Sequence, residues 1–577
     1  MKLSQLKELP TSREMIDVFG GYNHNLRIGE GEFYDMKNLT SADYPVLSPR
    51  SKRGIYEAPK KPQGMVAKDS LCYVDGSEFV INGYRIDMRL TTDDKAKTLI
   101  SMGAYVIIMP DKKYINTTNL SDYGSIEASV TTTSAVTFEL CKLDGSTYTE
   151  VTTSATEPTA PENMDLWIDT SSVPHTLKQY STTSMMWVSI ATTYIKITAT
   201  GLGIPFSEGD GVTISGVETL KDLNSTMVIH AKGDDFIVVT GILDKVETQD
   251  KPITVARRMP NMDFIIESKN RLWGCRYGIA LNGQMVNEIY ASKLGDFKNW
   301  NCFAGISTDS YAATVGTDGQ FTGAITHNGY PIFFKENHMH KVYGDFPAQY
   351  RIQDTACRGV QKGCSKSLAI VNEVLYYKSR SAVCAYDGSL PMEISSALGD
   401  EVYHDAVAGS LDNKYYISMA DANEAWHLFV YDTQRGMWHR EDETRVVDFC
   451  NCRGDLYFID YADNKIKTVR GTGVLETEDV SWEAITGTIG TDSPDKKYIS
   501  RLDVRMSLKV GTRVYFYVEY DSTGKWEHLF TMTGMTLQSF TVPVRPKRCD
   551  HLRLRIEGDG EAKIYSICKT VEQGSEI

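Results

Sequence analysis

Two short motifs carry residue types that could bind a metal ion. His338 and His340 are separated by one residue, and so are Cys450 and Cys452. Because side chains alternate along a strand, each pair would present two ligands on one face. A structural zinc site needs a second pair at a usable spacing, and neither motif has one. We therefore interpret both pairs as ordinary side chains of strands, and we predict no metal and no cofactor.

The usual catalytic signatures are missing from the sequence. It contains no GxSxG, HExxH, P-loop or dinucleotide-binding motif. Arginines that could clamp a substrate carboxylate, if the fold brought them together, are Arg257, Arg258, Arg271, Arg276 and Arg358. Nothing in their spacing requires that convergence. The sequence predicts no catalytic residues and a protein that is not an enzyme.

Charge and composition narrow the class of protein further. The chain has 577 residues, of which 41% are apolar and 24% charged, and its formal net charge is −14. This acidic balance argues against a protein that wraps nucleic acid by neutralising phosphates, but it allows a surface past which DNA moves without adhering. No run of about 18 apolar residues occurs, so we expect no membrane span. Eleven scattered cysteines without a CxxC pair favour reduced thiols and synthesis in a cytosol.

The elements that must position any site are almost all β-strands. Short segments rich in Val, Ile, Tyr and Phe alternate with Asp-Gly and Asn-Gly pairs, which favour two-residue hairpin turns. With Ile332, Leu375, Tyr415 and Leu456 as markers, these segments recur at steps of 43, 40 and 41 residues. A period near 40 residues is typical of β-propeller blades. We predict an all-β fold with a propeller of six or seven blades, and the alternative is a chain of separate sandwiches.

Two interruptions of this period divide the chain. The step from Val106 to Leu272 is too long for one blade, so a folded β module is inserted there, and after Gly471 longer alternating strands indicate a β-sandwich. An early segment is expected to complete the last blade. The predicted order is an extended N-terminal segment packing on the propeller (1–62), first blades (63–120), inserted β module or modules (121–252), remaining blades (253–473) and a C-terminal β-sandwich (474–577).

Two turns resemble motifs of known propellers. Ser292–Asp296, continuing to Trp300, resembles the Asp-box turn of sialidases. Tyr431–Trp438 is similar to the closing Tyr…Trp of a kelch blade. In both motifs an Asp accepts backbone N–H groups or a Trp packs between blades, so the resemblance concerns turns and packing. We interpret both as support for the architecture and not for an activity.

Several segments outside these turns share a further resemblance. They are Phe19–Asn23, Gly31–Thr40, Asp43–Arg50, Ile289–Trp300 and Arg548–Arg555. These segments resemble prophage and phage structural proteins of the packaged-DNA stabilisation or tail-hub type. Asp165–Trp187 is similar to small β modules of phage tail and fibre proteins.

The resemblance implies a structural virion protein of a tailed bacteriophage. Such a tail hub or nozzle subunit would be made in the bacterial host cytoplasm and would assemble, as a hexameric ring, below portal and adaptor proteins. The ring would retain packaged DNA, conduct it without sequence-specific binding, and carry fibres, spikes or a needle. An acidic lumen would suit that conduction, because it repels phosphate.

A second function remains open from the residues themselves. A receptor-binding or glycan-degrading phage tail protein would carry a saccharide site on its propeller and a carbohydrate-binding face on its sandwich. Tyr515, Tyr517 and Trp526 could stack on sugar rings there. Since Tyr515 and Tyr517 share one face of their strand, the competing interpretation is that this face packs on the propeller or on a neighbouring subunit. A host-encoded scaffold propeller is the third alternative.

Overall fold

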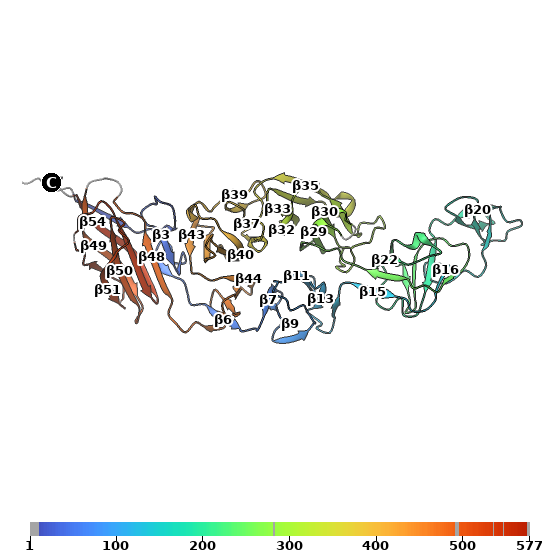
Figure 1. Ribbon diagram of the computed structural model, residues 1–577, viewed down its shortest axis with the longest axis horizontal. Coiled ribbons are helices and arrows are strands. Elements are labelled where there is room, and N and C mark those ends of the chain that lie inside the picture. Colours follow the sequence, from blue (N-terminus) through green and yellow to red (C-terminus); the bar gives the residue numbers. More distant parts are fainter. Residues whose placement is uncertain (1–10, 281–282, 491–495, 535, 546, 574–577) are drawn as a thin grey trace, which may run out of the picture.

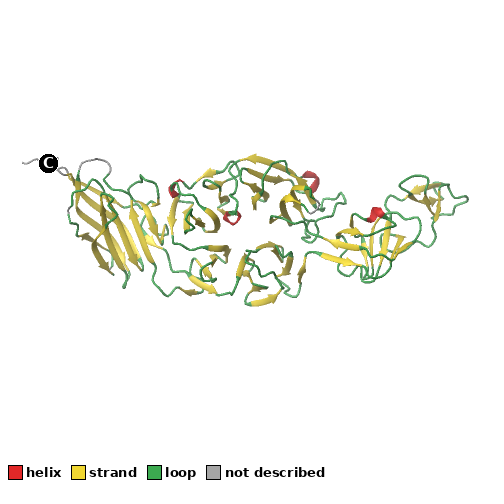
Figure 2. Cartoon of the chain, viewed as in Figure 1, coloured by secondary structure: helices red, strands yellow, loops and turns green. Residues whose placement is uncertain are grey.

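The computed structural model describes residues 11–280, 283–490, 496–534, 536–545 and 547–573. Over these residues every element is a strand except four 3₁₀ turns of three residues each, so the all-β expectation is confirmed (Figure 2). The molecule is elongated, with small sheets around its middle (Figure 1). The C-terminal sheets lie at one end, and the segment between residues 128 and 257 lies at the other.

Seven small antiparallel sheets form the middle of the molecule, and we call them the sheet ring. Sheet 1 contains β7 (Pro62–Ala67), β8 (Leu71–Asp75), β9 (Glu78–Ile81) and β10 (Tyr84–Asp87), and sheet 2 contains β11 (Thr98–Met102), β12 (Tyr105–Met109), β13 (Lys113–Asn116) and β14 (Tyr123–Ser125). Sheet 3 contains β28 (Phe264–Ser268), β29 (Arg271–Ile279), β30 (Met285–Ala291) and β31 (Tyr311–Thr314).

The remaining sheets follow in sequence order. Sheet 4 contains β32 (Phe321–His327), β33 (Tyr330–Lys335), β34 (His338–Tyr343) and β35 (Arg351–Ala356), and sheet 5 contains β36 (Ala369–Val371), β37 (Val374–Lys378), β38 (Val383–Tyr386) and β39 (Met392–Glu393). Sheet 6 contains β40 (His404–Leu411), β41 (Lys414–Ala420), β42 (Trp426–Asp432) and β43 (Met437–Arg440). Sheet 7 contains β44 (Val446–Cys452), β45 (Asp455–Asp460), β46 (Ile466–Thr468), β6 (Gly54–Glu57) and β47 (Val474–Leu475).

The first strands of neighbouring sheets contact one another in a closed circuit. β7 contacts β11, β11 contacts β28, and β28 contacts β32. The circuit continues through the 3₁₀ turn η3 (Ser365–Ser367) and β36 to β40, then to β44 and back to β7. Small sheets that follow one another around an axis in this way are consistent with a β-propeller.

Strand β12 shows why the middle strands of these sheets are apolar on both faces. Val106 and Ile108 belong to the apolar cluster shared with sheet 1. Ile107 and Met109 point the other way and belong to the cluster shared with sheet 3. Because each sheet is covered on both sides, its central strands read as continuous apolar runs and not as an alternating pattern.

Sheet 7 is completed by a strand from the beginning of the chain. β6 pairs antiparallel with β46, with Gly54 opposite Thr468, so the prediction that an early segment completes the last blade is confirmed. A Cβ atom at Gly54 would lie 2.2 Å from the carbonyl oxygen of Thr472. This close backbone approach requires glycine.

The segment that leads to β6 also ties the sheet ring to the C-terminal sheets. We call residues 11–57 the strap. Its strands β2 (Gly21–Tyr22) and β3 (Glu32–Lys37) lie between β43 of sheet 6 and β48 (Ser481–Thr486), which makes one ten-stranded sheet. The order of that sheet is β40-β41-β42-β43-β2-β3-β48-β53-β50-β51. The N-terminal segment was expected to pack on the propeller, and it contacts the C-terminal sheets as well.

Two sheets make up the C-terminal part. The ten-stranded sheet continues through β53 (Leu552–Asp559), β50 (Arg513–Tyr520) and β51 (Trp526–Thr533), and the other sheet contains β1 (Thr11–Ile16), β54 (Ala562–Gln573), β49 (Lys497–Leu508) and β52 (Gln538–Val542). Val514, Phe516 and Val518 point inward and are buried. They share one apolar cluster with Phe33 of the strap and Tyr415 of sheet 6. The core is therefore continuous where the strap, the sheet ring and the C-terminal sheets meet, and we call this region the joint.

The residues between sheets 2 and 3 form a separate group of sheets, which we call the insert. The first sheet contains β15 (Ala128–Thr131), β27 (Thr254–Arg257), β22 (Gly211–Ser215) and β23 (Thr226–Val228). The second contains β24 (Ala231–Lys232), β25 (Phe236–Thr240), β21 (Tyr194–Thr198), β16 (Val136–Cys141) and β26 (Glu247–Gln249). The third contains β17 (Thr152–Ser154), β18 (Leu166–Asp169), β19 (Thr176–Ser181) and β20 (Met186–Ser189). Ala128 pairs with Arg257, so the two ends of the insert lie side by side. The second of these paired strands, β27, ends at Arg257, so the insert extends beyond residue 252, where its end was expected from the sequence.

Candidate functional site

Both candidate metal-binding pairs pack against their own strands and neighbouring side chains. His338 and His340 lie on β34, and the Nδ1 atoms of both face Asp354 Oδ1, at 3.0 and 3.6 Å. His340 is fully buried, its Nε2 lies 2.8 Å from Thr317 Oγ1, and burial lowers the pKa of its imidazole to about 4. Cys450 and Cys452 are buried in the cluster between sheets 7 and 1, and burial raises the pKa of both thiols. Within the described residues no group of three or more His, Cys, Asp or Glu is placed to hold a metal ion.

The candidate arginines do not converge. Arg257 pairs with Asp210 inside the insert, and Arg276 pairs with Asp263 at 3.2 Å. Arg271 donates to the carbonyl oxygens of Ser292 and Asp309, at 2.7 and 2.6 Å. Arg358 pairs with Glu393 at 2.8 Å, and Arg258 is exposed. Each guanidinium has its own surroundings, so these residues form no common clamp for a substrate carboxylate.

The two propeller-like turns serve packing, as the sequence predicted. Asp296 Oδ1 accepts the backbone N–H of Lys298 at 3.0 Å, and the Nε1–H of Trp300 donates to the carbonyl oxygen of Phe297 at 3.0 Å. Trp438 is 1% exposed, donates from Nε1 to the carbonyl oxygen of Ile394 at 2.8 Å, and contacts Tyr431 with ring centroids 4.9 Å apart. Both tryptophans fill space between sheets.

Asn38 connects three parts of the molecule through one residue. Its backbone has a positive φ of 52°, and its N–H donates to the carbonyl oxygen of Glu441 just after sheet 6. Its Nδ2 donates to the carbonyl oxygen of Ser481 at 2.8 Å, where β48 begins. Its Oδ1 accepts a hydrogen bond from Arg50 Nε at 2.8 Å. These hydrogen bonds connect the strap with sheet 6 and with the C-terminal sheets, so Asn38 and Arg50 help to build the joint.

A buried ion-pair group holds the end of the strap against sheets 6 and 7. Arg53 is 4% exposed and contacts Glu441 at 2.7 Å and Asp442 at 2.8 Å. Its guanidinium also lies over the ring of Phe458, 5.3 Å from the centroid. Burial alone would raise the pKa of Asp442, but Arg53, the hydrogen bonds with Thr444, and Arg50 together outweigh that effect, and the pKa falls to about 2. The carboxylate is therefore ionised at neutral pH, and Arg53 makes the largest contribution to keeping it so.

A polar groove opens on the sheet ring between sheets 4, 5 and 6. Two adjoining cavities of about 730 and 380 Å³ share Glu336 and Asn337. Glu336 is half-buried, whereas Asp400, Glu401 and Arg380 are exposed, and none of these four makes an ion pair within the described chain. The groove therefore offers carboxylates and one guanidinium that have no ion-pair partner among the described residues. Arg358, paired with Glu393, lines it as well, and Glu336 Oε1 accepts the backbone N–H of Lys362 at 3.3 Å.

The base of this groove is held in place by buried polar side chains. Lys378 is 3% exposed, and its Nζ donates to Gln361 Oε1 at 3.0 Å and to the carbonyl oxygen of Ser379 at 2.5 Å. Burial lowers the pKa of this lysine. Tyr403, 5% exposed, lines the same cavity. Mixed carboxylates, cations and one aromatic side chain suit a ligand with many hydroxyl groups.

The tyrosine face of the C-terminal sheet is covered by its own arginines. Tyr517 lies beside His528, with ring centroids 5.3 Å apart, and the guanidinium of Arg555 lies 5.7 Å from the Tyr517 centroid and 5.9 Å from that of Trp526. Tyr515 is half-buried on the same face. The contacts described for Tyr517 and Trp526 are with side chains of the neighbouring strands β51 and β53. The propeller was one of the two packing partners expected from the sequence for this face, and these contacts are not with the propeller.

Comparisons with known proteins identify no family. No protein-family description and no curated protein matches the chain. Among solved structures it is similar to Raptor from Chaetomium thermophilum, with 10% identity, a TM-score of 0.30, and coverage of 74% of this chain and 30% of that one. It is also similar to an exo-β-1,3-galactanase from Phanerochaete chrysosporium, with 7% identity, a TM-score of 0.21, and coverage of 53% and 94%. The chain thus spans less than a third of the length of Raptor.

One further match is a Trypanosoma rangeli sialidase, with 10% identity, a TM-score of 0.21, and coverage of 98% of this chain and 96% of that one. At such TM-scores these similarities carry no argument for a particular activity. They do overturn one prediction: the chain was expected not to be an enzyme, and the similar structures include glycoside hydrolases and a sialidase. That prediction is wrong. The matches named above are not phage tail proteins.

Sequence reasoning missed both the joint and the groove. The basic residues Arg50 and Arg53 stand close together in the sequence, but the carboxylate partner Glu441 of Arg53 lies nearly four hundred residues away in the chain, so their spacing did not predict the joint. Glu336 and Asp400 lie in loops whose spacing resembles no motif.

No helix among the described residues is long and apolar enough to cross a membrane.

Proposed function

We propose that this chain is a structural subunit of a bacteriophage tail, a hub or nozzle protein whose seven-bladed propeller and C-terminal sandwich act as one rigid body. The observation that carries this proposal is the joint. The segments that resemble tail-hub proteins include Gly31–Thr40 and Asp43–Arg50, and these residues supply β3 and the hydrogen bonds of Asn38. They hold together a ten-stranded sheet that runs from the ring into the C-terminal part (Figure 1).

A rigid body of this kind suits mechanical work. Domains joined by a flexible linker move relative to one another, whereas a shared sheet and a shared core oppose such movement. The insert projects at the far end of the molecule, where loops and appended modules are free to meet neighbours. We propose that copies of the chain close into a hexameric ring, that this ring contacts portal and adaptor proteins, and that fibres, spikes or a needle attach to it.

The charge of the chain is compatible with a conduit for DNA. A net charge of −14 leaves little electrostatic attraction for phosphates, so a duplex can pass without the counter-ion release that drives tight binding. The protein would then act in the virion tail, after synthesis in the bacterial host cytoplasm.

Assembly tests this proposal. The full-length chain at micromolar concentration, alone and with an adaptor ring, is expected to form closed rings in electron microscopy and a single multimeric mass in mass photometry. Closed rings form because a head-to-tail interface closes on itself when its rotation allows. Cryo-EM of the intact particle would place the chain relative to portal and fibre. Monomers alone under both conditions would refute the proposal.

The polar groove favours a second candidate function, a tail protein that binds or cleaves a saccharide. Its specific support is the set of unpaired carboxylates, Glu336 and Glu401 among them, beside Arg380 and Tyr403 in one cavity system. A carboxylic acid and a carboxylate on either side of a glycosidic bond are the usual agents of hydrolysis.

Substitution in the groove tests this second candidate. If the groove cleaves glycans, Glu336→Gln and Glu401→Gln are each expected to lower the rate of reducing-sugar release by roughly 10²-fold or more, since a general acid or base contributes at least that much. Glu424→Gln serves as the matched control, because Glu424 is 77% exposed in a turn of sheet 6 outside the groove. A glycan array reports binding without cleavage. Equal activity in all three variants, or no saccharide bound by the parent protein, would exclude this function.

A further inference from the structure

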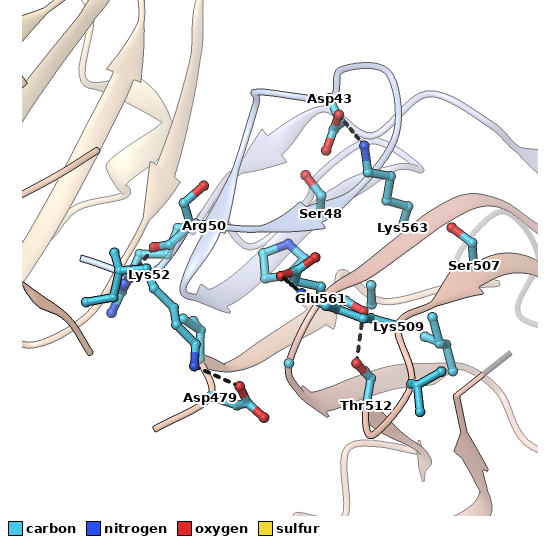
Figure 3. A pocket seen from close by; sticks show the side chains of 18 of the residues that line it. Asp43, Ser48, Arg50, Lys52, Asp479, Ser507, Lys509, Thr512, Glu561 and Lys563 are labelled. Carbon is cyan, nitrogen blue, oxygen red and sulfur yellow. Dashed lines mark hydrogen bonds and ion pairs between the residues drawn. The ribbon is translucent and has the colours of Figure 1, made fainter. Parts of the chain in front are cut away.

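A cavity lies at the joint, where three parts of the chain meet (Figure 3). It has a volume of about 750 Å³. Its walls come from the strap around Ser48–Lys52, from Arg470 and Leu475 of sheet 7, and from the ends of β49 and β54 in the C-terminal sheets. We call it the junction cavity. Its size lies within the range of pockets that enclose small organic molecules.

Positive charge predominates in this cavity although the whole chain is acidic. The carboxylates that line it are those of Asp43, Asp479 and Glu561. The cations that line it are those of Arg50, Lys52, Arg470, Lys509 and Lys563. A smaller cavity of about 250 Å³ adjoins it and shares Arg50 and Arg470; it adds the cations Arg53 and Lys414 and the carboxylates of Asp412 and Glu441. The excess of cations is therefore found among the residues that line the junction cavity itself, and such an excess on a chain of net charge −14 favours anions there.

Two kinds of cation line the junction cavity, and they differ in how firmly they are held. Arg50 is 11% exposed and pairs with Glu476 at 3.3 Å, so its position is fixed. Three lysines pair instead with carboxylates that also line the cavity: Lys563 with Asp43 at 2.7 Å, Lys509 with Glu561 at 2.6 Å, and Lys52 with Asp479 at 3.0 Å (Figure 3).

Those three lysines are available to a ligand at little cost. Lys509 and Glu561 are 65% and 74% exposed, and Lys563 is 49% exposed. Ion pairs at such exposure contribute little to stability, because water and salt screen them. Hydrogen bonds with Asp43 and Glu561 raise the pKa of Lys563 and Lys509, so both remain charged at neutral pH. A ligand that offers more negative charge than one carboxylate can therefore draw them inward.

The remaining walls indicate what else the ligand carries. Leu475 and Val510 are 52% and 95% exposed at the cavity, which gives it an apolar side. A phosphomonoester carries up to two negative charges on three oxygens, and charge-assisted hydrogen bonds to such oxygens are among the stronger contacts that lysine and arginine make. We propose that the junction cavity binds a small phosphomonoester, with its phosphate among Arg50, Lys509 and Lys563 and its organic part toward Leu475 and Val510.

Binding at this place would lock the joint, because the ligand would contact the strap, sheet 7 and the C-terminal sheets together. The inference rests on the cavity and stands whether or not the chain proves to be a tail subunit. It is tested on the full-length protein by isothermal titration calorimetry and by thermal unfolding at constant ionic strength. The probes are inorganic phosphate, glycerol phosphate, a nucleoside monophosphate and a single-stranded oligonucleotide, with chloride as the reference anion.

We expect saturable binding of the phosphomonoesters and a rise in the unfolding midpoint that grows with their concentration. The double variant Lys509→Ala/Lys563→Ala is expected to bind at least tenfold more weakly, and Lys509→Arg/Lys563→Arg to keep binding. The control is Lys547→Ala, because Lys547 is 55% exposed in the C-terminal part, pairs with Glu527 and does not line the cavity. Binding to the oligonucleotide alone, no saturable heat with any phosphomonoester, or equal affinity in parent and double variant would overturn the proposal.

Discussion

Replacing Arg53 with alanine is expected to lower the free energy of unfolding of the joint by about 3–5 kcal/mol, the usual result of removing one partner from a buried ion pair. Glu441 and Asp442 would then remain at 5% and 14% exposure without their cation. Because Arg53 immediately precedes β6, the strand that completes sheet 7 would lose its anchor. Hydrogen exchange of β6 amides reports the local effect, and urea denaturation reports the global one.

The control for this experiment is Lys245→Ala. Lys245 is 80% exposed and pairs with Glu247 at 3.5 Å, so its loss is expected to change stability by no more than about 0.5 kcal/mol.

The pKa of Asp442 is depressed to about 2, below the ordinary value near 3.9. The stability that this carboxylate contributes is therefore complete above about pH 4 and is lost as the pH falls toward 2. A difference between Arg53→Ala and the parent protein below 1 kcal/mol at pH 7 would contradict the assignment.

Replacing Trp438 with alanine is also expected to lower the free energy of unfolding by about 3–5 kcal/mol, in this case because a large buried side chain is lost from the core. Trp438 is 1% exposed, and its strand pairs with the strap, since Tyr22 lies opposite it. Alanine would leave a cavity beside Tyr431 and would deprive the carbonyl oxygen of Ile394 of its donor. Denaturant unfolding monitored by circular dichroism measures the loss.

Two further variants separate packing from hydrogen bonding at this position. Trp438→Phe keeps an aromatic ring but removes the Nε1–H, so it is expected to cost less than alanine. Trp187→Ala is the control, because Trp187 is only half-buried and lies in the small sheet of the insert. The sheet ring should unfold in that control as it does in the parent protein. If Trp438→Ala and Trp187→Ala had equal effects on the ring, Trp438 would not hold sheet 6 in place.

Local pattern was sufficient to predict the strands of the sheet ring. Ile332, Leu375, Tyr415 and Leu456 mark the repeat, and all four are fully buried on the second strands of sheets 4 to 7. A strand covered on both faces must be apolar at nearly every position, and this leaves a signal within a few residues of sequence. Turns such as Asp387-Gly388 mark the strand ends by the same local logic.

Long-range pairing was not predictable in this way. β2 contains two residues, Gly21 and Tyr22, which is too short for any alternation to show, yet it connects two halves of a ten-stranded sheet. The partners of Arg53 lie nearly four hundred residues further along the chain, and spacing holds no information about such a contact. The groove was missed for a related reason, because Glu336 and Asp400 come together through loops of different sheets and not through a shared element.

The way in which the insert leaves the sheet ring has a consequence for how such a molecule can change over time. Ala128 and Arg257 face each other on paired strands, so more than a hundred residues depart and return through one narrow neck. Ring closure does not pass through that neck, because β11 and β28 contact each other directly. The rest of the insert can therefore be lengthened, shortened or replaced by another domain while the sheet ring keeps its geometry. Changes in the insert would therefore leave the scaffold intact.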